Sequence, residues 1–265
     1  MTKHGPRIVS LVPSLTETLS HFGLMNNIAG CTNFCTEPRK LRHTVPAVGG
    51  TKDARIKDIL DLRPTHVVVN REENTQAILN DLHYASEKCP FEIIETFPEM
   101  PEDNFQLIEL LGEVFGFAQL AADWNAVQMD KLTELKQKMR SAQHFSFAYF
   151  IWMNPWMVAG NQTYISNTLA LIKGQNNFET GSDLRERYPC IQSNDPRLKN
   201  TQVMMFSSEP FPFKNRHIEE FRRQSENLRP CLKVDGQALS WYGSRFSHTI
   251  TYLGRLHADI QKALG

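Results

Sequence analysis

The stretch that decides the fold is FAQLAADWNAVQMDKLTELKQKMRSA, residues 117–142. Its apolar side chains recur mostly every three or four residues, which is the period of an amphipathic helix. At about 1.5 Å of rise per residue, a helix over this stretch would be roughly 39 Å long. A helix of that length would separate the chain into two halves, so the pattern of each half decides what the helix connects.

Strands and helices alternate on both sides of this helix. The predicted strands are residues 7–12, 66–70 and 91–97 before it and residues 145–152, 201–206 and 231–234 after it. Such alternation is typical of mainly parallel sheets with helices on their faces. The sequence therefore predicts an α/β protein with two three-layer lobes joined by one long interlobe helix. The predicted boundaries are an N-terminal lobe at residues 1–115, the connecting helix at 116–142 and a C-terminal lobe at 143–265.

Composition and charge exclude two classes of partner. The chain has 265 residues, with 29 basic and 29 acidic side chains, so its formal net charge is zero. A broad surface for nucleic acid would normally need an excess of positive charge. No apolar run approaches the roughly 20 residues that span a bilayer. We therefore expect no nucleic-acid partner and no transmembrane segment.

The N-terminal segment MTKHGPRIVSLVPS does not have the pattern of a secretory signal, because its apolar stretch is short and no small-residue cleavage site follows it. The protein is therefore expected to be cytoplasmic if this sequence is full length, or exported if a leader has been removed. The odd number of cysteines does not suggest a disulfide framework.

Motifs of nucleophilic, phosphate and metal chemistry are missing. The sequence contains neither G-x-S-x-G nor G-x-x-x-x-G-K-[ST]. Cys31 and Cys35 are four residues apart, and no nearby pair of cysteines or histidines completes a zinc site. Cys35 with a remote histidine would make a nucleophile, but a small structural thiol is the commoner role. We expect no catalytic residues, no metal site and no covalently bound cofactor, and hence no enzyme.

Candidate binding residues follow from the rule that ligands of open α/β sheets lie beyond the carboxyl ends of the strands. Trp152, Trp156 and Trp241 fall at such positions in the second half. Their rings would give a ligand flat, rigid contact area, and capping of the lobe core is the alternative for each. In the first half, residues 70–74 (NREEN) predict either a ligand rim or a solvated helix N-terminus.

The first strand runs directly into a helix at Pro13. Ser14 and Glu17 have the spacing of a capping box, in which Ser14 is the N-cap. The sequence therefore predicts a helix that begins at Ser14, with free N–H groups beside the strand end.

Several motifs resemble those of a known family. They are RIVSLVPSLTETL (7–19), VGGTKDARIKDILDLRPTHVVVNREEN (48–74), ETFP (95–98), NPWMVAGNQTYISNTLALIKGQNNF (154–178) and SSEPFPFKNRH (207–217). In this order, and with the long helix between them, they are similar to the helical-backbone class of substrate-binding proteins of ABC importers. That class includes the cobalamin-binding and iron–siderophore-binding receptors.

The resemblance implies a ligand held in a cleft between the two lobes. The implied ligand is a corrinoid such as cobalamin or a ferric siderophore, and the implied partner is an ABC transporter permease in the periplasm or cell envelope. The implied ligand-binding residues of the first lobe are Pro13, Ser14, Asn33, Phe34, Gly50, Thr51, Asn70, Arg71 and Asn74. Those of the second lobe are Trp152, Asn154, Trp156, Phe211, Trp241, Tyr242 and Arg245. The implied transporter-docking residues are Glu72, Glu73 and Glu209.

A cytoplasmic enzyme or ligand sensor on the same two-lobe scaffold is the alternative, because a fold does not fix a function. The polar groups at residues 70–74 and 207–209 would suit such a role. This alternative predicts a carboxylate or thiol with a perturbed pKa at the site.

Overall fold

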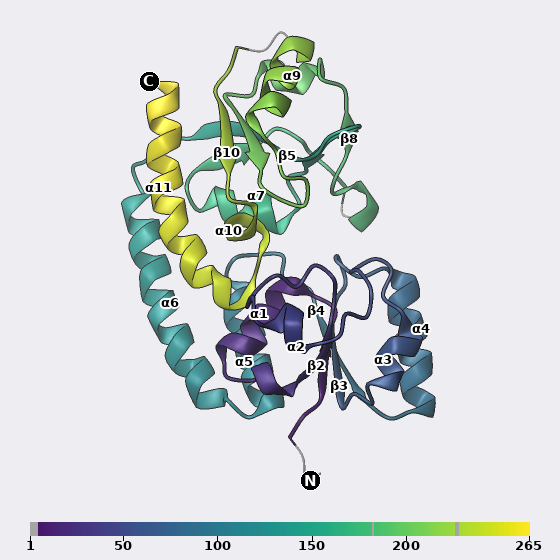
Figure 1. Ribbon diagram of the computed structural model, residues 1–265. Coiled ribbons are helices and arrows are strands. Elements are labelled where there is room, and N and C mark those ends of the chain that lie inside the picture. The colour runs from purple at the N-terminus through teal and green to yellow at the C-terminus, as the bar shows by residue number, and fades with distance from the viewer. Residues whose placement is uncertain (1–4, 182, 226–227) are drawn as a thin grey trace. The chain divides into compact units, whose positions relative to one another are not determined.

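The computed structural model describes residues 5–181, 183–225 and 228–265, so the first four residues of the predicted N-terminal lobe lie outside it. The chain forms two compact units (Figure 1). Unit 1 consists of Met1–Pro98, Glu102–Asn125 and Tyr242–Arg245. Unit 2 consists of Glu99–Pro101, Ala126–Trp241 and Phe246–Gly265.

Unit 1 is built, over its described residues, on a four-stranded parallel sheet. The strands, in spatial order, are β2 (Ile28–Cys31), β1 (Ile8–Ser10), β3 (His66–Asn70) and β4 (Glu92–Thr96). The helical elements are α1 (Pro13–His21), η1 (Met25–Asn27), α2 (Leu41–Thr44), α3 (Ile56–Asp61), α4 (Gln76–Lys88), α5 (Asp103–Phe115), the first part of α6 (Ala118–Lys138), and η3 (Gly243–Arg245). Because all strands are parallel, their carboxyl ends meet at one edge of the sheet.

The core of unit 1 explains why its strands read as apolar runs. Val9, Val67 and Val69 pack in one cluster with Ile59 of α3 and Leu82 of α4. β-branched side chains favour the extended backbone, and a parallel sheet covered on its faces buries successive residues of a strand. The predicted strand at residues 66–70 is therefore found unchanged as β3.

Helix α1 starts earlier than the sequence predicts. Its N-cap is Val12, which makes no side-chain capping bond, and Pro13 is the first helical residue. Proline suits this place because its fixed φ matches the helix and its missing N–H would have no partner there. The predicted capping box is thus wrong: Ser14 lies inside the helix, and the Glu17 carboxylate binds the Arg245 guanidinium at 2.6 and 2.8 Å.

Unit 2 is built, over its described residues, on a six-stranded sheet in the order β10-β9-β5-β6-β8, with β7 paired to β5. The strands are β5 (Phe145–Trp152), β6 (Trp156–Ala159), β7 (Gly174–Asn176), β8 (Cys190–Ile191), β9 (Val203–Ser207) and β10 (Cys231–Val234). Strands β5, β7, β9 and β10 are parallel, and β6 is antiparallel to β5 and β8. The prediction of two α/β lobes with mainly parallel sheets is confirmed.

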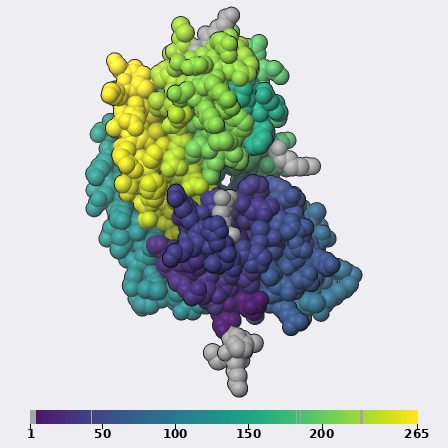
Figure 2. Space-filling view, viewed as in Figure 1, coloured from purple at the N-terminus to yellow at the C-terminus, as the bar shows by residue number. Residues whose placement is uncertain are grey.

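The helical elements of unit 2 include part of α6 and the whole of the long helix α11. They are the second part of α6, α7 (Tyr164–Ala170), η2 (Leu184–Glu186), α8 (Pro196–Lys199), α9 (Asn215–Ser225), α10 (Gly236–Ser240) and α11 (Phe246–Leu264). One face of α11 is buried, with Phe246, Ile250 and Leu253 at helical spacing. Its other face lies at the surface of unit 2 (yellow in Figure 2). Among the described helices, none is both long and apolar enough to cross a membrane.

Helix α6 carries the chain from unit 1 into unit 2, with the division after Asn125. It spans Ala118–Lys138, 21 residues, so the helix predicted over residues 117–142 is found but is too long at its C-terminal end. Beyond Lys138 the N–H of Arg140 donates to the carbonyl three residues earlier. That is the tighter 3-10 pattern in which α-helices commonly end.

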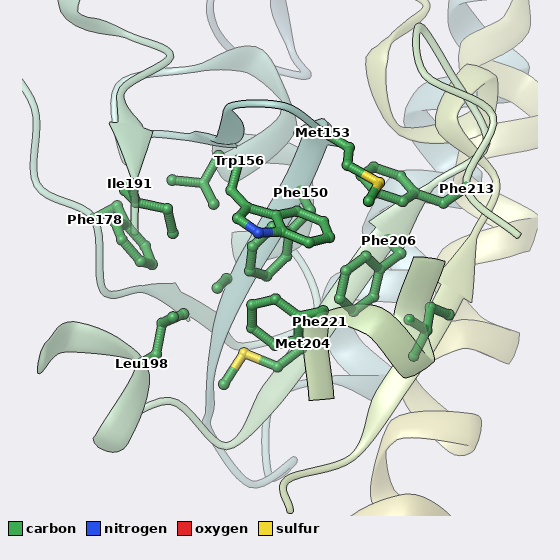
Figure 3. Close-up of a cluster of buried hydrophobic side chains, with 13 residues drawn as sticks. Phe150, Met153, Trp156, Phe178, Ile191, Leu198, Met204, Phe206, Phe213 and Phe221 are labelled. Atoms are coloured by element: carbon green, nitrogen blue, oxygen red, sulfur yellow. The ribbon is translucent and has the colours of Figure 1, made fainter. Parts of the chain in front are cut away.

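An aromatic cluster fills the core of unit 2 (Figure 3). The Phe150 ring stacks on the Phe206 ring at a centroid distance of 4.7 Å and meets Phe221 edge-on at 4.8 Å. Trp156 meets Phe150 edge-on at 5.9 Å, and its indole N–H donates to Gln224 Oε1 at 2.9 Å. The aromatic content of residues 145–152 is therefore explained by the central place of β5 in this sheet.

Replacing Phe150 with alanine is expected to lower the free energy of unfolding by about 3–5 kcal/mol, because the buried ring would leave a cavity among its aromatic neighbours. Trp152→Ala is the control, since Trp152 ends the same strand but is 41% exposed; it should cost below about 1 kcal/mol. Urea unfolding followed by circular dichroism measures both. Equal losses in the two variants would contradict the core assignment.

Candidate functional site

Two buried asparagines organise the carboxyl edge of the unit 1 sheet. Asn70 Oδ1 accepts the N–H groups of residues 72–73 at 2.8 and 3.0 Å, and the N–H of Asn70 donates to Asn74 Oδ1 at 2.8 Å. Asn74 Nδ2 donates to the carbonyls of Leu11 at 3.2 Å and Thr51 at 2.9 Å. One amide thus ties together the segments that follow β1 and β3 and the loop that carries Thr51.

The sequence predicts either a ligand rim or a solvated helix N-terminus at residues 70–74, and these contacts bear on that choice. The side chains of Asn70 and Asn74 bind backbone groups of their own loop and of the neighbouring segments, so they support the edge. Arg71 is exposed, and its guanidinium lies 5.2 Å from the centroid of the Phe97 ring and 3.3 Å from the Glu95 carboxylate. Of these three predicted ligand-binding residues, Arg71 is the one whose side chain stands at the surface.

The turn after β2 presents two predicted residues to solvent. The backbone is fixed, because the N–H of Asn33 donates to the Gly49 carbonyl at 2.8 Å and that of Phe34 to Thr32 Oγ1 at 3.3 Å. The Phe34 side chain is nevertheless 59% exposed. Gly50 is buried, and a Cβ there would collide with Asp53 Oδ1, which accepts the Gly50 N–H at 2.8 Å, and would come within 3.0 Å of the Phe34 ring. The missing side chain at Gly50 therefore leaves space for the Asp53 carboxylate and the Phe34 ring.

The remaining predicted residues of unit 1 lie deeper. Pro13 and Ser14 are buried in the first turn of α1, and Thr51 is partly buried. They lie at the carboxyl edge of the sheet, where ligands of open α/β sheets are expected. Because Pro13 and Ser14 are buried, their side chains present little surface to a ligand.

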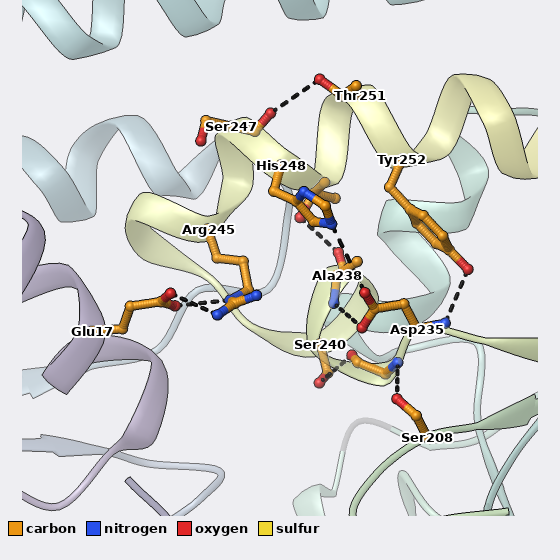
Figure 4. Close-up of polar contacts among 12 residues, drawn as sticks. Glu17, Ser208, Asp235, Ala238, Ser240, Arg245, Ser247, His248, Thr251 and Tyr252 are labelled. Atoms are coloured by element: carbon orange, nitrogen blue, oxygen red, sulfur yellow. Dashed lines mark hydrogen bonds and ion pairs between the residues drawn. The ribbon is translucent and has the colours of Figure 1, made fainter. Parts of the chain in front are cut away.

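Tyr242 and Arg245 belong to unit 1, although the sequence assigned both to the second-lobe rim. Tyr242 Oη donates to Glu73 Oε1 at 2.8 Å, and Arg245 pairs with Glu17 (Figure 4). Gly243 has a φ of 83°, and a Cβ there would collide with Thr18. Partners so distant in sequence leave no local pattern, which is why the sequence misplaced these two residues.

Burial and the Glu73 carboxylate raise the pKa of Tyr242 well above its ordinary value. The hydroxyl is therefore protonated at neutral pH and donates a hydrogen bond to the Glu73 carboxylate. This hydrogen bond gives Tyr242 a supporting role under the Glu72–Glu73 loop.

A cavity of about 510 Å³ opens at the carboxyl ends of β9 and β10 in unit 2. Its lining residues are Phe206, Ser208, Glu209, Phe213, Lys233, Val234, Asp235 and Gln237. Asp235 caps α10, since its Oδ1 accepts the Ala238 N–H at 3.1 Å, and the Asp235 N–H donates to Tyr252 Oη at 2.9 Å (Figure 4). The sequence reasoning did not select Lys233, Asp235 or Gln237. Lys233 lies in the predicted strand at residues 231–234, and Asp235 and Gln237 directly follow it. The rule that ligands lie beyond the carboxyl ends of strands could therefore have identified them.

Glu209 stands at this cavity and is partly buried. Its carboxylate accepts the indole N–H of Trp241 at 2.5 Å and the Ser240 hydroxyl at 3.4 Å. Burial raises the pKa of Glu209 above its ordinary value, and the hydrogen bonds from Trp241 and Ser240 oppose that shift. Trp241 is itself buried, and its indole N–H holds the Glu209 carboxylate in place.

The three tryptophans of unit 2 divide between the two roles considered from the sequence. Trp156 is a core residue, as described above, and the prediction that it lines a ligand rim is corrected. Trp152 is 41% exposed, and its ring meets the partly buried Phe211 edge-on at 5.6 Å. Asn154 is also exposed and has a positive φ of 59° in the turn between β5 and β6. Trp152, Phe211 and Asn154 therefore form the accessible part of the predicted set in unit 2.

The arrangement suits binding through shape and apolar contact. An exposed aromatic ring stands at the carboxyl edge of each sheet: Phe34 on the hydrogen-bonded turn after β2 and Trp152 at the end of β5. Among the described residues, no group of three or more His, Cys, Asp or Glu side chains is placed to hold a metal ion.

Solved structures share this fold along nearly the whole chain. The vitamin B12-binding protein BtuF of Vibrio cholerae is 19% identical, with a TM-score of 0.78 and coverage of 97% of each chain. The heme-binding protein RhuT of Roseiflexus sp. RS-1 is 17% identical, with a TM-score of 0.80 and coverage of 99% of this chain and 100% of that one. A heme-binding protein of Pseudomonas aeruginosa is 18% identical, with a TM-score of 0.80 and coverage of 99% and 95%. At these identities the likeness shows the fold alone.

Comparison with curated proteins found no match. The model of one family, described as periplasmic binding protein, matches residues 8–207, well over half of the chain. The chain therefore belongs to the periplasmic binding protein family, which consists of solute-binding proteins of ABC importers and not of enzymes.

Proposed function

We propose that this protein binds a corrinoid of the cobalamin type and delivers it to the permease of an ABC importer. The observation that carries the proposal is an exposed aromatic side chain at the carboxyl edge of each sheet: Phe34, 59% exposed, in unit 1 and Trp152, 41% exposed, in unit 2. Large rings exposed at such positions favour a large ligand with flat, partly apolar surfaces. A corrinoid has such surfaces.

The proposed contacts are the accessible members of the predicted set. They are Asn33, Phe34 and Arg71 in unit 1 and Trp152, Asn154 and Phe211 in unit 2. The aromatic members supply contact area, and the asparagines and Arg71 supply hydrogen bonds to polar groups at the ligand periphery. The buried members, among them Asn74, Tyr242 and Trp241, position the loops that carry these side chains.

Haem is the second candidate ligand, because two of the solved structures named above are described as heme-binding proteins. The vitamin B12-binding relative supports the corrinoid. A ferric siderophore, the other ligand expected from the sequence, receives support from the family resemblance. Direct comparison of the three ligand classes decides among them.

We propose the periplasm or cell envelope as the place of action and a position peripheral to the membrane beside the permease. The candidate docking residues are Glu72, Glu73 and Glu209 at the carboxyl edges. Two of them are held in place, Glu73 by Tyr242 and Glu209 by Trp241. Lys52 Nζ donates to the Glu72 carbonyl at 2.5 Å, which fixes the backbone of the same loop.

The proposal predicts saturable quenching of tryptophan fluorescence when cyanocobalamin or cobinamide is added, since Trp152 would contact the ligand. Equilibrium dialysis gives an independent dissociation constant, free of absorption by the ligand. Haemin and ferrichrome are titrated in parallel. Saturable binding of haemin or ferrichrome without any binding of corrinoids would overturn the corrinoid assignment, and binding of none of them would overturn the proposed ligand class.

Phe34→Ala is expected to weaken corrinoid binding by about 1 kcal/mol or more, which is roughly fivefold in Kd. Tyr84→Ala is the matched control, because Tyr84 is 61% exposed in the same unit but lies on α4. It should leave the Kd unchanged. Similar Kd values for both variants and the unaltered protein would remove Phe34 from the binding site.

Glu209→Gln is expected to stabilise the fold increasingly as the pH rises above 4.5, the ordinary carboxyl value. Folding raises the pKa of Glu209, so the folded state holds the proton more tightly and ionisation at higher pH lowers stability. Glutamine keeps an oxygen that accepts the Trp241 indole N–H and removes the charge. The effect is measured as the difference in unfolding free energy between the Glu209→Gln variant and the unaltered protein at pH values below and above 4.5. A difference independent of pH would show that Glu209 carries no such penalty.

A further inference from the structure

A pair of thiols in unit 1 is not used by the proposed function. Cys31 ends β2, and Cys35 closes the turn that follows, where its N–H donates to the Thr32 carbonyl at 3.1 Å. The turn brings both thiols to the lining of one small cavity. Both thiols are free and buried. Two thiols beside one cavity on one short turn are placed for chemistry that a single thiol cannot perform.

A cavity gives small reagents a route to this pair. It has a volume of about 220 Å³ and is lined by Cys31, Thr32, Asn33, Cys35, Val45 and Ala47. Asn33 is exposed, so the cavity lies beside the surface although the sulfurs themselves are covered.

Hydroxyl groups surround the sulfur of Cys35. Thr16 Oγ1 lies 3.2 Å and Thr32 Oγ1 3.3 Å from Cys35 Sγ. Thr32 Oγ1 accepts the N–H of Phe34 at 3.3 Å, which leaves its own hydrogen for the sulfur. Hydrogen bonds donated to sulfur stabilise the thiolate, which is the reactive form of cysteine.

The two thiols differ in acidity for the same reason. Hydrogen bonding with Cys31, Thr16 and Thr32 lowers the pKa of Cys35 to about 6, against the opposing effect of burial. The hydrogen bond to Cys35, together with burial, raises the pKa of Cys31. At neutral pH the pair therefore holds one proton, on Cys31, and Cys35 is the nucleophile.

We propose that Cys31 and Cys35 form a modification site, at which small-molecule disulfides reversibly oxidise the pair to an intramolecular disulfide. The Cys35 thiolate attacks one sulfur of the reagent RSSR, forming a mixed disulfide and releasing RS⁻. RS⁻ takes the proton of Cys31, and the Cys31 thiolate then attacks the Cys35 sulfur and expels a second RS⁻, which is protonated by solvent. The two protein thiols are oxidised, and RSSR is reduced to two RSH.

The test uses the full chain with Cys89, Cys190 and Cys231 replaced by serine, so that only this pair can react. The folded protein is incubated with oxidised glutathione, quenched in acid, alkylated after denaturation and analysed by mass spectrometry. The expected product has lost two hydrogen atoms, retains no glutathione and contains a peptide with both cysteines linked, and dithiothreitol restores the thiols. The initial rate should follow a pKa of about 6 and not the ordinary value of 9.0.

Single-serine variants separate the two roles. Cys31→Ser should accumulate a mixed disulfide with glutathione at Cys35, and Cys35→Ser should react at least tenfold more slowly at Cys31. Thermal unfolding followed by circular dichroism establishes that each variant folds. The unaltered chain is oxidised, alkylated and analysed in the same way. It shows whether the Cys31–Cys35 disulfide also forms when no residue is substituted. The proposal is overturned if the folded chain forms no Cys31–Cys35 disulfide under conditions that oxidise the denatured chain, or if Cys31 reacts first.

Discussion

Parallel strand pairing is the constraint on which the rest of this structure depends. A parallel ladder requires each strand to return by a crossover, so helices cover the sheet and successive strands enter from the same end. In unit 1 every strand obeys this rule, and the loops after β1, β2 and β3 therefore gather at one edge. In unit 2 the same holds for β5, β9 and β10, where the cavity beside Glu209 lies. Parallel pairing therefore places the loops of the candidate site at these edges of the sheets.

Loops gathered at one edge carry polar backbone groups that must find partners once they are buried. Asn70 and Asn74 satisfy such groups in three segments. In the same way, Tyr242 donates a hydrogen bond to Glu73, and Trp241 donates one to Glu209. Each of these residues was predicted to contact a ligand or a permease, and each has its polar group engaged within its own unit. The proposed binding surface is thereby limited to side chains that stand outside this network, such as Phe34 and Trp152.

The cysteine pair illustrates the same division between local and distant information. The spacing of Cys31 and Cys35 excluded a C-x-x-C motif, and the sequence indicated small structural thiols. The turn closed by the Cys35 N–H places both thiols beside one cavity, and Thr16, from a different segment, adds a hydroxyl. A perturbed thiol pKa was named as a mark of an enzyme. Here the lowered pKa of Cys35 occurs in a member of a solute-binding family, so a perturbed thiol pKa does not by itself mark an enzyme.

The sequence by itself determined the elements and their order. Strands β3, β5 and β10 begin and end where the apolar and aromatic runs predict, and the amphipathic period places α6 correctly to within a few residues. These features are local, because side-chain period and β-branching act over a few residues. Only the tertiary structure decided which aromatic rings are exposed and to which unit Tyr242 and Arg245 belong. Trp152 and Trp156 are alike in local pattern, and the packing of Phe150, Phe206 and Phe221 buries one and leaves the other at the surface. Burial and pairing depend on partners far apart in the chain, and no short window of sequence contains them.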